Sequence, residues 1–398
     1  MSTNSRVWAY SLPATVLLMA PFDILASLAM DIYLPVVPAM PGILNTSPAI
    51  VQLSLSLYMV MLGLGQIVFG PISDRIGRRP VLIGGALLFA VASFCLAASS
   101  TAIPFIVFRF LQAAGASAAL VATFATVRDV YAERPESAVI YSLFSAMLSF
   151  VPALGPIAGA VLADGLGWRA IFVALGAFTI LALVNAVFRW HETRPVAAVN
   201  TKRSILPIFI SLAFWTYTLG FSAAMGTFFV FFSTAPRVLI DGAGFSEVTF
   251  SLAFATAAFA MIVTTRFART FVAKWGISGS LARGMLLLLL GAVLLSIGQL
   301  FGAASFLTFI MPMWVMAIGI VFAVSVTANG ALKGFDDIAG TAVAFYFCIQ
   351  SLITGILGTL AVITLRGDTA WPLVAYSSIM AVVVLTALAL LRRQKILG

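Results

Sequence analysis

Long apolar runs separated by short polar segments make up almost the whole sequence. Each of twelve runs reaches the roughly 20 residues that a helix needs to cross the hydrocarbon core of a bilayer. They cover approximately residues 12–34, 49–70, 81–98, 102–124, 137–163, 168–188, 207–235, 246–265, 281–300, 304–327, 340–364 and 371–391. Lipid offers no partner to an open backbone, and the alternation typical of a membrane barrel is missing. The pattern predicts an all-α membrane protein with twelve transmembrane helices.

The longest polar segment divides these helices into six and six. It predicts an N-terminal bundle over residues 1–188, a cytoplasmic linker over 189–206 and a C-terminal bundle over 207–398. The linker holds the single histidine, His191, which we expect to be solvated rather than catalytic or metal-binding. "GPISDRIGRRP" and "RFARTFVAKWG" follow the second and eighth runs, and their glycines, Gly77 and Gly276, are half a chain length apart. This spacing favours an internal duplication.

Composition excludes a soluble protein. The chain is 62% hydrophobic and 9% charged, and its mean hydropathy is +1.12, whereas soluble domains carry about 25% charged residues. The net charge of +9 could suggest a nucleic-acid partner, but the basic residues lie in short loops. With the N-terminus in the cytoplasm, 18 Lys and Arg side chains fall on the cytoplasmic side and three outside. This excess predicts cytoplasmic termini and no nucleic acid. The first run shows no convincing cleavage site, so we expect a retained helix.

Three charged residues interrupt the apolar runs of the first half. At the helical rise of 1.5 Å, Asp23 lies about 16 Å from the start of its run, near mid-membrane, and Asp31 about 28 Å. Arg109 lies within the fourth run. Each such charge costs about 2.5–3.5 kcal/mol on insertion scales, so a function is expected. Arg109 and Asp31 could instead form a static ion pair. Asp23 has no cation at its level, and we expect it to bind either a proton or polar groups of a substrate.

A second candidate feature is the charged string after the second run. Glycines there permit close helix approach and a tight turn, while the charges can hold a helix end by hydrogen bonds and release it. A gating role is therefore predicted, with a plain positive-inside anchor as the alternative. The residues are Gly70, Asp74, Arg75, Gly77, Arg78 and Arg79.

This string resembles the signature of the major facilitator superfamily, as does "RFLQAAGAS", which has Ala113 where glycine is usual. "PALGPIAGA" resembles the motif of its drug/proton antiporters through Pro152, Gly155, Pro156 and Gly159, although Ala160 replaces a glycine. "FDILASLAMDIYLPVVPAMPGIL", "WHETRP" and "FDDIAGTAVAFYFC" are similar to segments of the bacterial florfenicol and chloramphenicol exporters. The resemblance implies the major facilitator fold, two six-helix bundles that rock around a central site.

The resemblance also implies a proton-coupled antiporter that exports phenicol antibiotics across a bacterial inner membrane. Asp23, Asp31 and Arg109 would then serve proton coupling and substrate binding. Aromatic residues would form apolar walls for the neutral drug, with packing or lipid contact as the alternative. The candidates are Tyr33, Tyr58, Tyr217, Phe221 and Phe228.

The remaining predictions concern partners and rival functions. No Gly-x-x-x-x-Gly-Lys-Ser/Thr phosphate loop occurs in the sequence, which argues against ATP-driven pumping. We expect no cofactor and no metal site, and a monomer suffices for the architecture. A proton-coupled nutrient importer is the nearest rival. A membrane-embedded enzyme would need a catalytic cluster, and a sensor would need soluble signalling domains; neither is evident in the sequence.

Overall fold

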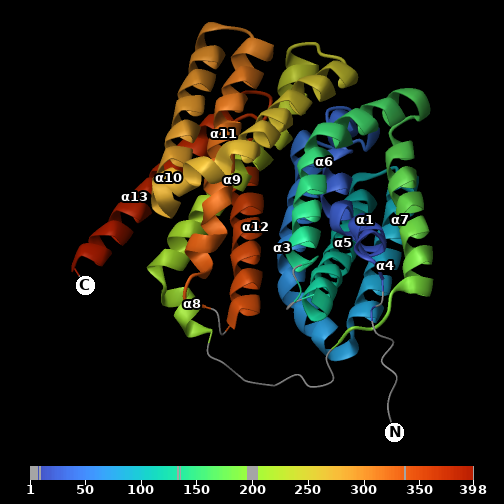
Figure 1. Ribbon diagram of the computed structural model, residues 1–398. Coiled ribbons are helices and arrows are strands. Elements are labelled where there is room, and N and C mark those ends of the chain that lie inside the picture. Colours follow the sequence, from blue (N-terminus) through green and yellow to red (C-terminus); the bar gives the residue numbers. More distant parts are fainter. Residues whose placement is uncertain are drawn as a thin grey trace. The chain divides into compact units, whose positions relative to one another are not determined.

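A computed structural model describes residues 8, 10–131, 134, 136–194, 205–335 and 338–397. Within these ranges the regular structure is helical, without strands. Eleven of the described helices are long and apolar enough to cross a membrane (Figure 1). The expectation of an all-α membrane protein is confirmed. The predicted linker 189–206 lies for the most part outside the described residues.

The first of two compact units comprises Met1–Tyr33 and Pro41–Thr201. Its long helices are α1 (Leu12–Asp31), α3 (Pro48–Ile76), α4 (Arg78–Ala98), α5 (Ala102–Tyr131), α6 (Glu136–Leu166) and α7 (Arg169–Arg189). The helix α4 packs along α5 and α7, and α1 packs along α5 and α6. Small residues allow close approach: a Cβ at Gly85 would lie 2.8 Å from the Gly115 carbonyl oxygen.

The second unit comprises Leu34–Met40 and Lys202–Gly398. It contains the short helices η1 (Leu34–Val36), α8 (Leu206–Ile210), η2 (Arg237–Gly242) and η3 (Phe306–Ile310). Its long helices are α9 (Leu212–Pro236), α10 (Glu247–Phe301), α11 (Met311–Leu332), α12 (Ala339–Thr364) and α13 (Trp371–Leu397). The helix α9 is central, because α11, α12 and α13 all pack on it. The four-residue α2 (Met40–Ile43) spans the point in the sequence where the second unit's segment Leu34–Met40 ends and the first unit's segment Pro41–Thr201 begins.

The helix α10 contains two of the predicted spans. Gly276 interrupts it with φ +69° and ψ 177°, which are not helical values. Figure 1 shows the arms before and after this residue running in different directions. Each arm exceeds the about 20 residues that cross a bilayer. Counting both arms, the described residues contain the twelve predicted spans.

Gly77 interrupts the helical backbone in the same way between α3 and α4. Its φ is +111° and its ψ is 161°, a combination that is accessible to glycine but strained for a residue with a side chain. Gly77 and Gly276 thus share a positive φ and an extended ψ at corresponding places in the two halves of the sequence. This local similarity supports the inferred duplication.

Candidate functional site

Asp23 lies in the middle of α1 with 1% of its surface exposed. Neither carboxylate oxygen has a hydrogen-bond partner among the described residues. Pro21 lies two residues earlier inside the same helix, and its missing N–H leaves a carbonyl of the preceding turn without its helical bond. A buried, unpartnered carboxylate is costly. The geometry therefore leaves Asp23 able to take up a proton or to accept hydrogen bonds from a ligand.

Arg109 lies on α5 and is completely buried. Its Nη1 donates to the carbonyl oxygen of Ala29 at 3.1 Å and to Oε1 of Gln112 at 2.8 Å. Nε2 of Gln112 donates in turn to Oγ of Ser93 on α4 at 2.8 Å. Nε and Nη2 of Arg109 have no partner in the part of the chain that the structure describes. The guanidinium thus joins α5 to the last turn of α1 and keeps two free donors.

The alternative of a static ion pair between Arg109 and Asp31 is not realised. The ion pairs of the described residues do not include Arg109. Its guanidinium instead lies over two aromatic rings, with Cζ 5.1 Å from the centre of Tyr33 and 4.4 Å from that of Tyr58. The sequence placed both charges inside apolar runs, but only side-chain direction decides whether they meet.

The antiporter-like string lies along α6, opposite the end of α1. Pro152 and Pro156 are inside this helix. A Cβ at Gly155 would lie 2.8 Å from Cβ of Asp31, and one at Gly159 would overlap the carbonyl oxygen of Ile32. These glycines therefore allow α6 to touch the backbone at the C-terminal end of α1, which carries Asp31.

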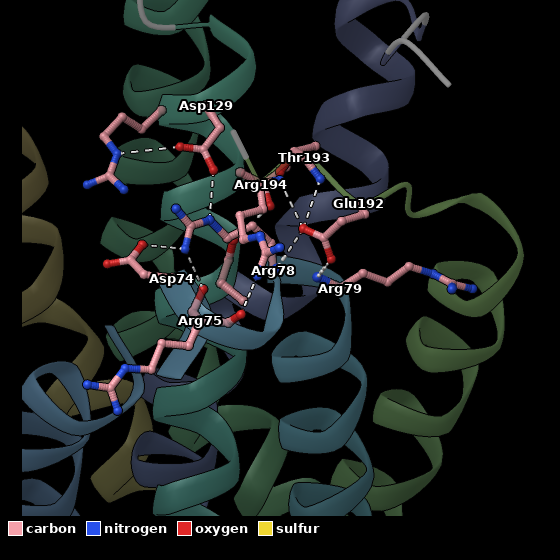
Figure 2. A network of polar contacts seen from close by, with 12 residues as sticks. Asp74, Arg75, Arg78, Arg79, Asp129, Glu192, Thr193 and Arg194 are labelled. Carbon is pink, nitrogen blue, oxygen red and sulfur yellow. Dashed lines mark hydrogen bonds and ion pairs between the residues drawn. The ribbon is translucent and has the colours of Figure 1, made fainter. Parts of the chain in front are cut away.

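The predicted gating string surrounds the turn between α3 and α4 (Figure 2). Arg78 is 3% exposed. Its Nε donates to Asp129 Oδ2 at 2.7 Å, and its Nη1 donates to Asp74 Oδ1 at 2.6 Å and to Ser73 Oγ at 3.0 Å. Asp129 belongs to α5 and is equally buried, whereas Asp74 is largely exposed. Arg78 therefore ties the ends of α3 and α5 to the start of α4.

Glu192 completes this network from the segment that follows α7. Its carboxylate accepts the backbone N–H groups of Arg78 at 2.8 Å and Arg79 at 3.2 Å, as Figure 2 shows. The first N–H groups of a helix lack intrahelical partners, so Glu192 caps α4 from a distant part of the chain. The Arg194 guanidinium donates to the Arg75 carbonyl oxygen. The sequence did not single out Asp129, Glu192 or Arg194, because nothing in their spacing from the string indicates a contact.

Two expectations in this region need correction. Gly70 does not mediate a close approach within the described residues, because no atom lies within 4 Å of where its Cβ would be. His191 is half-buried rather than simply solvated. Its ring centre lies 5.7 Å from that of Tyr10 and 6.5 Å from that of Trp8. The described residues contain no group of His, Cys, Asp and Glu that could hold a metal ion.

The other aromatic candidates pack within the second unit. Phe221 stacks on Tyr346 at a ring-centre distance of 4.9 Å. Phe228 lies 6.1 Å from Phe254, and a Cβ at Gly330 would meet the ring of Tyr217. The described contacts place these three candidates in aromatic and helix-packing clusters. Their proposed role as walls of a drug cavity stays a prediction.

Comparison with known proteins finds a matching family model and two related drug-resistance proteins. Residues 22–359 match the Major Facilitator Superfamily. A chloramphenicol resistance protein of Pseudomonas aeruginosa is 52% identical over 387 residues, which are 97% of this chain and 92% of the relative. The multidrug resistance protein MdtL of Escherichia coli is 30% identical over 242 residues, 59% of this chain and 61% of the relative.

Two solved structures share the fold. A POT family transporter in complex with 5-aminolevulinic acid has a TM-score of 0.72 at 14% identity, covering 96% of this chain and 94% of that one. A bacterial homolog of the human lysosomal transporter Spinster, in an inward-facing and occupied conformation, has a TM-score of 0.72 at 17% identity, covering 98% and 96%.

Proposed function

Because the chain belongs to the major facilitator superfamily, we propose that it is a proton-coupled antiporter that exports phenicol antibiotics from the bacterial cytoplasm. The protein is a multi-pass membrane transporter and not an enzyme. Its relative with 52% identity over nearly the whole chain is a chloramphenicol resistance protein. This supports chloramphenicol as a substrate, and the resemblance to phenicol exporters extends the proposal to florfenicol.

The observation that carries the coupling mechanism is the buried, unpartnered carboxylate of Asp23. Phenicols are uncharged, so a carboxylate would meet them through their hydroxyl and amide donors. Protonation removes that acceptor charge, so proton uptake and drug binding compete at one group. In the proposed cycle, drug leaves when Asp23 takes up a proton outside and binds after the proton is released inside.

One proton supplies enough energy for this exchange. An elementary charge crossing roughly 150 mV releases about 3.5 kcal/mol, while each tenfold gradient of a neutral solute costs about 1.4 kcal/mol. A one-to-one exchange could thus sustain a drug gradient of about 300-fold. The excess of basic residues on one side supports an inner-membrane protein with both termini in the cytoplasm. A monomer is sufficient for this mechanism.

The substitution Asp23→Asn tests the coupling role. In inverted vesicles from a host that lacks its own drug pumps, the unchanged protein should release protons when chloramphenicol or florfenicol is added. Asp23→Asn should abolish this drug-dependent proton flux, because an amide has no exchangeable carboxyl proton. The control Asp164→Asn changes an exposed residue on α6 and should behave like the unchanged protein.

The outcomes separate the proposal from its rivals. Normal drug-coupled proton flux in Asp23→Asn would remove Asp23 from the mechanism. A proton gradient that drives substrate into cells rather than out would indicate an importer. If a susceptibility panel shows no protection against either phenicol at equal protein levels in the membrane, the proposed substrate class is wrong.

A further inference from the structure

Arg109 presents an energetic problem that its predicted partner does not solve. It is fully buried, and the described residues place no carboxylate in an ion pair with it. Removing a cation from water costs several kcal/mol even after relaxation. Without a salt bridge, other interactions of Arg109 have to compensate for this cost of desolvation.

Two aromatic faces take the place of a carboxylate. Tyr58 from α3 and Tyr33, just beyond the end of α1, lie within 4.4 and 5.1 Å of the guanidinium carbon. Both tyrosines are fully buried. The negative face of an aromatic ring attracts a cation most strongly when both are removed from water, and the planar guanidinium stacks well on such rings. The carbonyl of Ala29, at the negative end of α1, adds a third favourable contact.

Tyr58 does more than cover the cation. Its hydroxyl donates to the carbonyl oxygen of Ala26 at 3.0 Å, three residues before the carbonyl that accepts from Arg109. Positions three apart are neighbours on a helix surface. Tyr58 and Arg109 therefore hold adjacent points of α1, between Asp23 and Asp31. One side chain thus contacts both the guanidinium and the helix segment that carries the two carboxylates.

We propose that Tyr58 is a positioning residue for transport: its ring holds the guanidinium of Arg109 in place, and its hydroxyl fixes the segment of α1 between Asp23 and Asp31. Because the aromatic rings stabilise the cation, neither Asp23 nor Asp31 has to form a permanent ion pair with it. The free Nε and Nη2 donors of Arg109 also stay available. The consequence for transport rests on the proposed antiport function, whereas the coupling between Tyr58 and Arg109 does not.

This proposal differs from a role for Tyr58 as a wall that touches the drug. A wall residue contributes substrate binding, so its loss raises KM while the maximal rate stays high. A positioning residue that acts through Arg109 contributes to the conformational and proton steps, so its loss lowers the maximal rate. A residue that only fills the core changes the amount of folded protein and has no particular coupling to Arg109.

A double-variant cycle measures that coupling directly. The thermal unfolding midpoint of the purified protein in detergent is compared for Tyr58→Leu, Arg109→Lys and the double variant. Lysine keeps the charge but loses the planar stacking group. If the two residues act together, the midpoint of the double variant should fall by clearly less than the sum of the two single losses. Tyr131→Leu is the matched control: this buried tyrosine bonds Thr15, and its loss should add fully to that of Arg109→Lys.

Transport kinetics of vesicles supply the second readout. Tyr58→Leu should lower the maximal rate of drug-coupled exchange about 10- to 30-fold, the equivalent of a desolvated cation–π contact, while KM stays nearly constant. Tyr58→Phe keeps the ring and loses the bond to Ala26, so its maximal rate should lie between that of Tyr58→Leu and that of the unchanged protein. Full additivity of Tyr58→Leu and Arg109→Lys in the thermal cycle would overturn the proposal. So would a raised KM at an unchanged maximal rate.

The two readouts also separate this inference from the proposed function. If the unchanged protein moves no phenicol, the antiport proposal fails, yet the thermal cycle still decides whether Tyr58 holds Arg109. If phenicol export is normal but the cycle is additive, the antiport proposal stands and the positioning role of Tyr58 falls.

Discussion

Replacing Gly77 by alanine should destabilise the protein more than the same change at Gly276. Both glycines have a positive φ, +111° and +69°, so alanine is strained at either position. The surroundings differ. A Cβ at Gly77 would lie 2.8 Å from the carboxyl carbon of Glu192, whereas one at Gly276 would meet no atom within 4 Å. The pair therefore separates backbone strain from displacement of the Glu192 cap.

The expected magnitudes follow from these contacts. A residue held in a sparsely populated backbone region costs about 1–3 kcal/mol, and this applies to both variants. Hydrogen bonds to charged groups contribute about 1.5–3 kcal/mol. Glu192 is exposed, so we take the lower figure for the loss of its bonds to the N–H groups of Arg78 and Arg79. Gly77→Ala should exceed Gly276→Ala by about 1.5 kcal/mol in free energy of unfolding.

The assay is unfolding of the purified protein by SDS in mixed micelles, followed by far-UV circular dichroism. Repeating both substitutions in a Glu192→Ala background provides the internal check. There the collision disappears, so Gly77→Ala should cost only the backbone strain, as Gly276→Ala does. Equal costs of the two glycine substitutions in the unchanged background would refute the role assigned to Glu192 as the cap of α4.

Two further predictions concern packing. Arg78→Lys should lower the free energy of unfolding by about 2–4 kcal/mol, because lysine cannot make the forked bonds that Arg78 makes to the buried Asp129 and to Asp74. SDS titration measures this loss, and an unchanged midpoint would contradict it. Gly159→Ala should cost about 1–3 kcal/mol or more through overlap with the Ile32 backbone, while Gly165→Ala, whose Cβ would meet open space, should be nearly neutral. Comparable losses for both glycines would exclude the close contact between α6 and α1.

For the gating string, the sequence predicted the glycine turn and the charged residues but not the residues that they contact. Its glycine turn and its charged residues were identified from spacing, and Gly77 has the backbone geometry that such a turn requires. The partners of the string were not identified. Asp129 and Glu192 are separated from Arg78 by 51 and 114 residues, and no local pattern indicates that these segments return to the same helix end.

For the intramembrane charges too, the sequence identifies the residues but not their partners. The insertion cost marks Asp23, Asp31 and Arg109 as functional candidates from sequence alone. Their pairing could not be predicted, because a helix rotates by about 100° per residue and a small change in rotation decides which neighbour a side chain meets. The structure directs Arg109 to Tyr33, Tyr58 and the end of α1.

The sequence by itself determined the membrane class, the twelve spans and the tight turn at Gly77, because transfer of an apolar segment into lipid and the backbone freedom of glycine depend on local residues. Only the tertiary structure decided which polar groups meet. It left the carboxylate of Asp23 without a partner, gave Arg109 aromatic faces in place of Asp31, and capped α4 with Glu192. Those choices depend on helix rotation and on contacts between distant segments, which hydropathy and spacing do not encode.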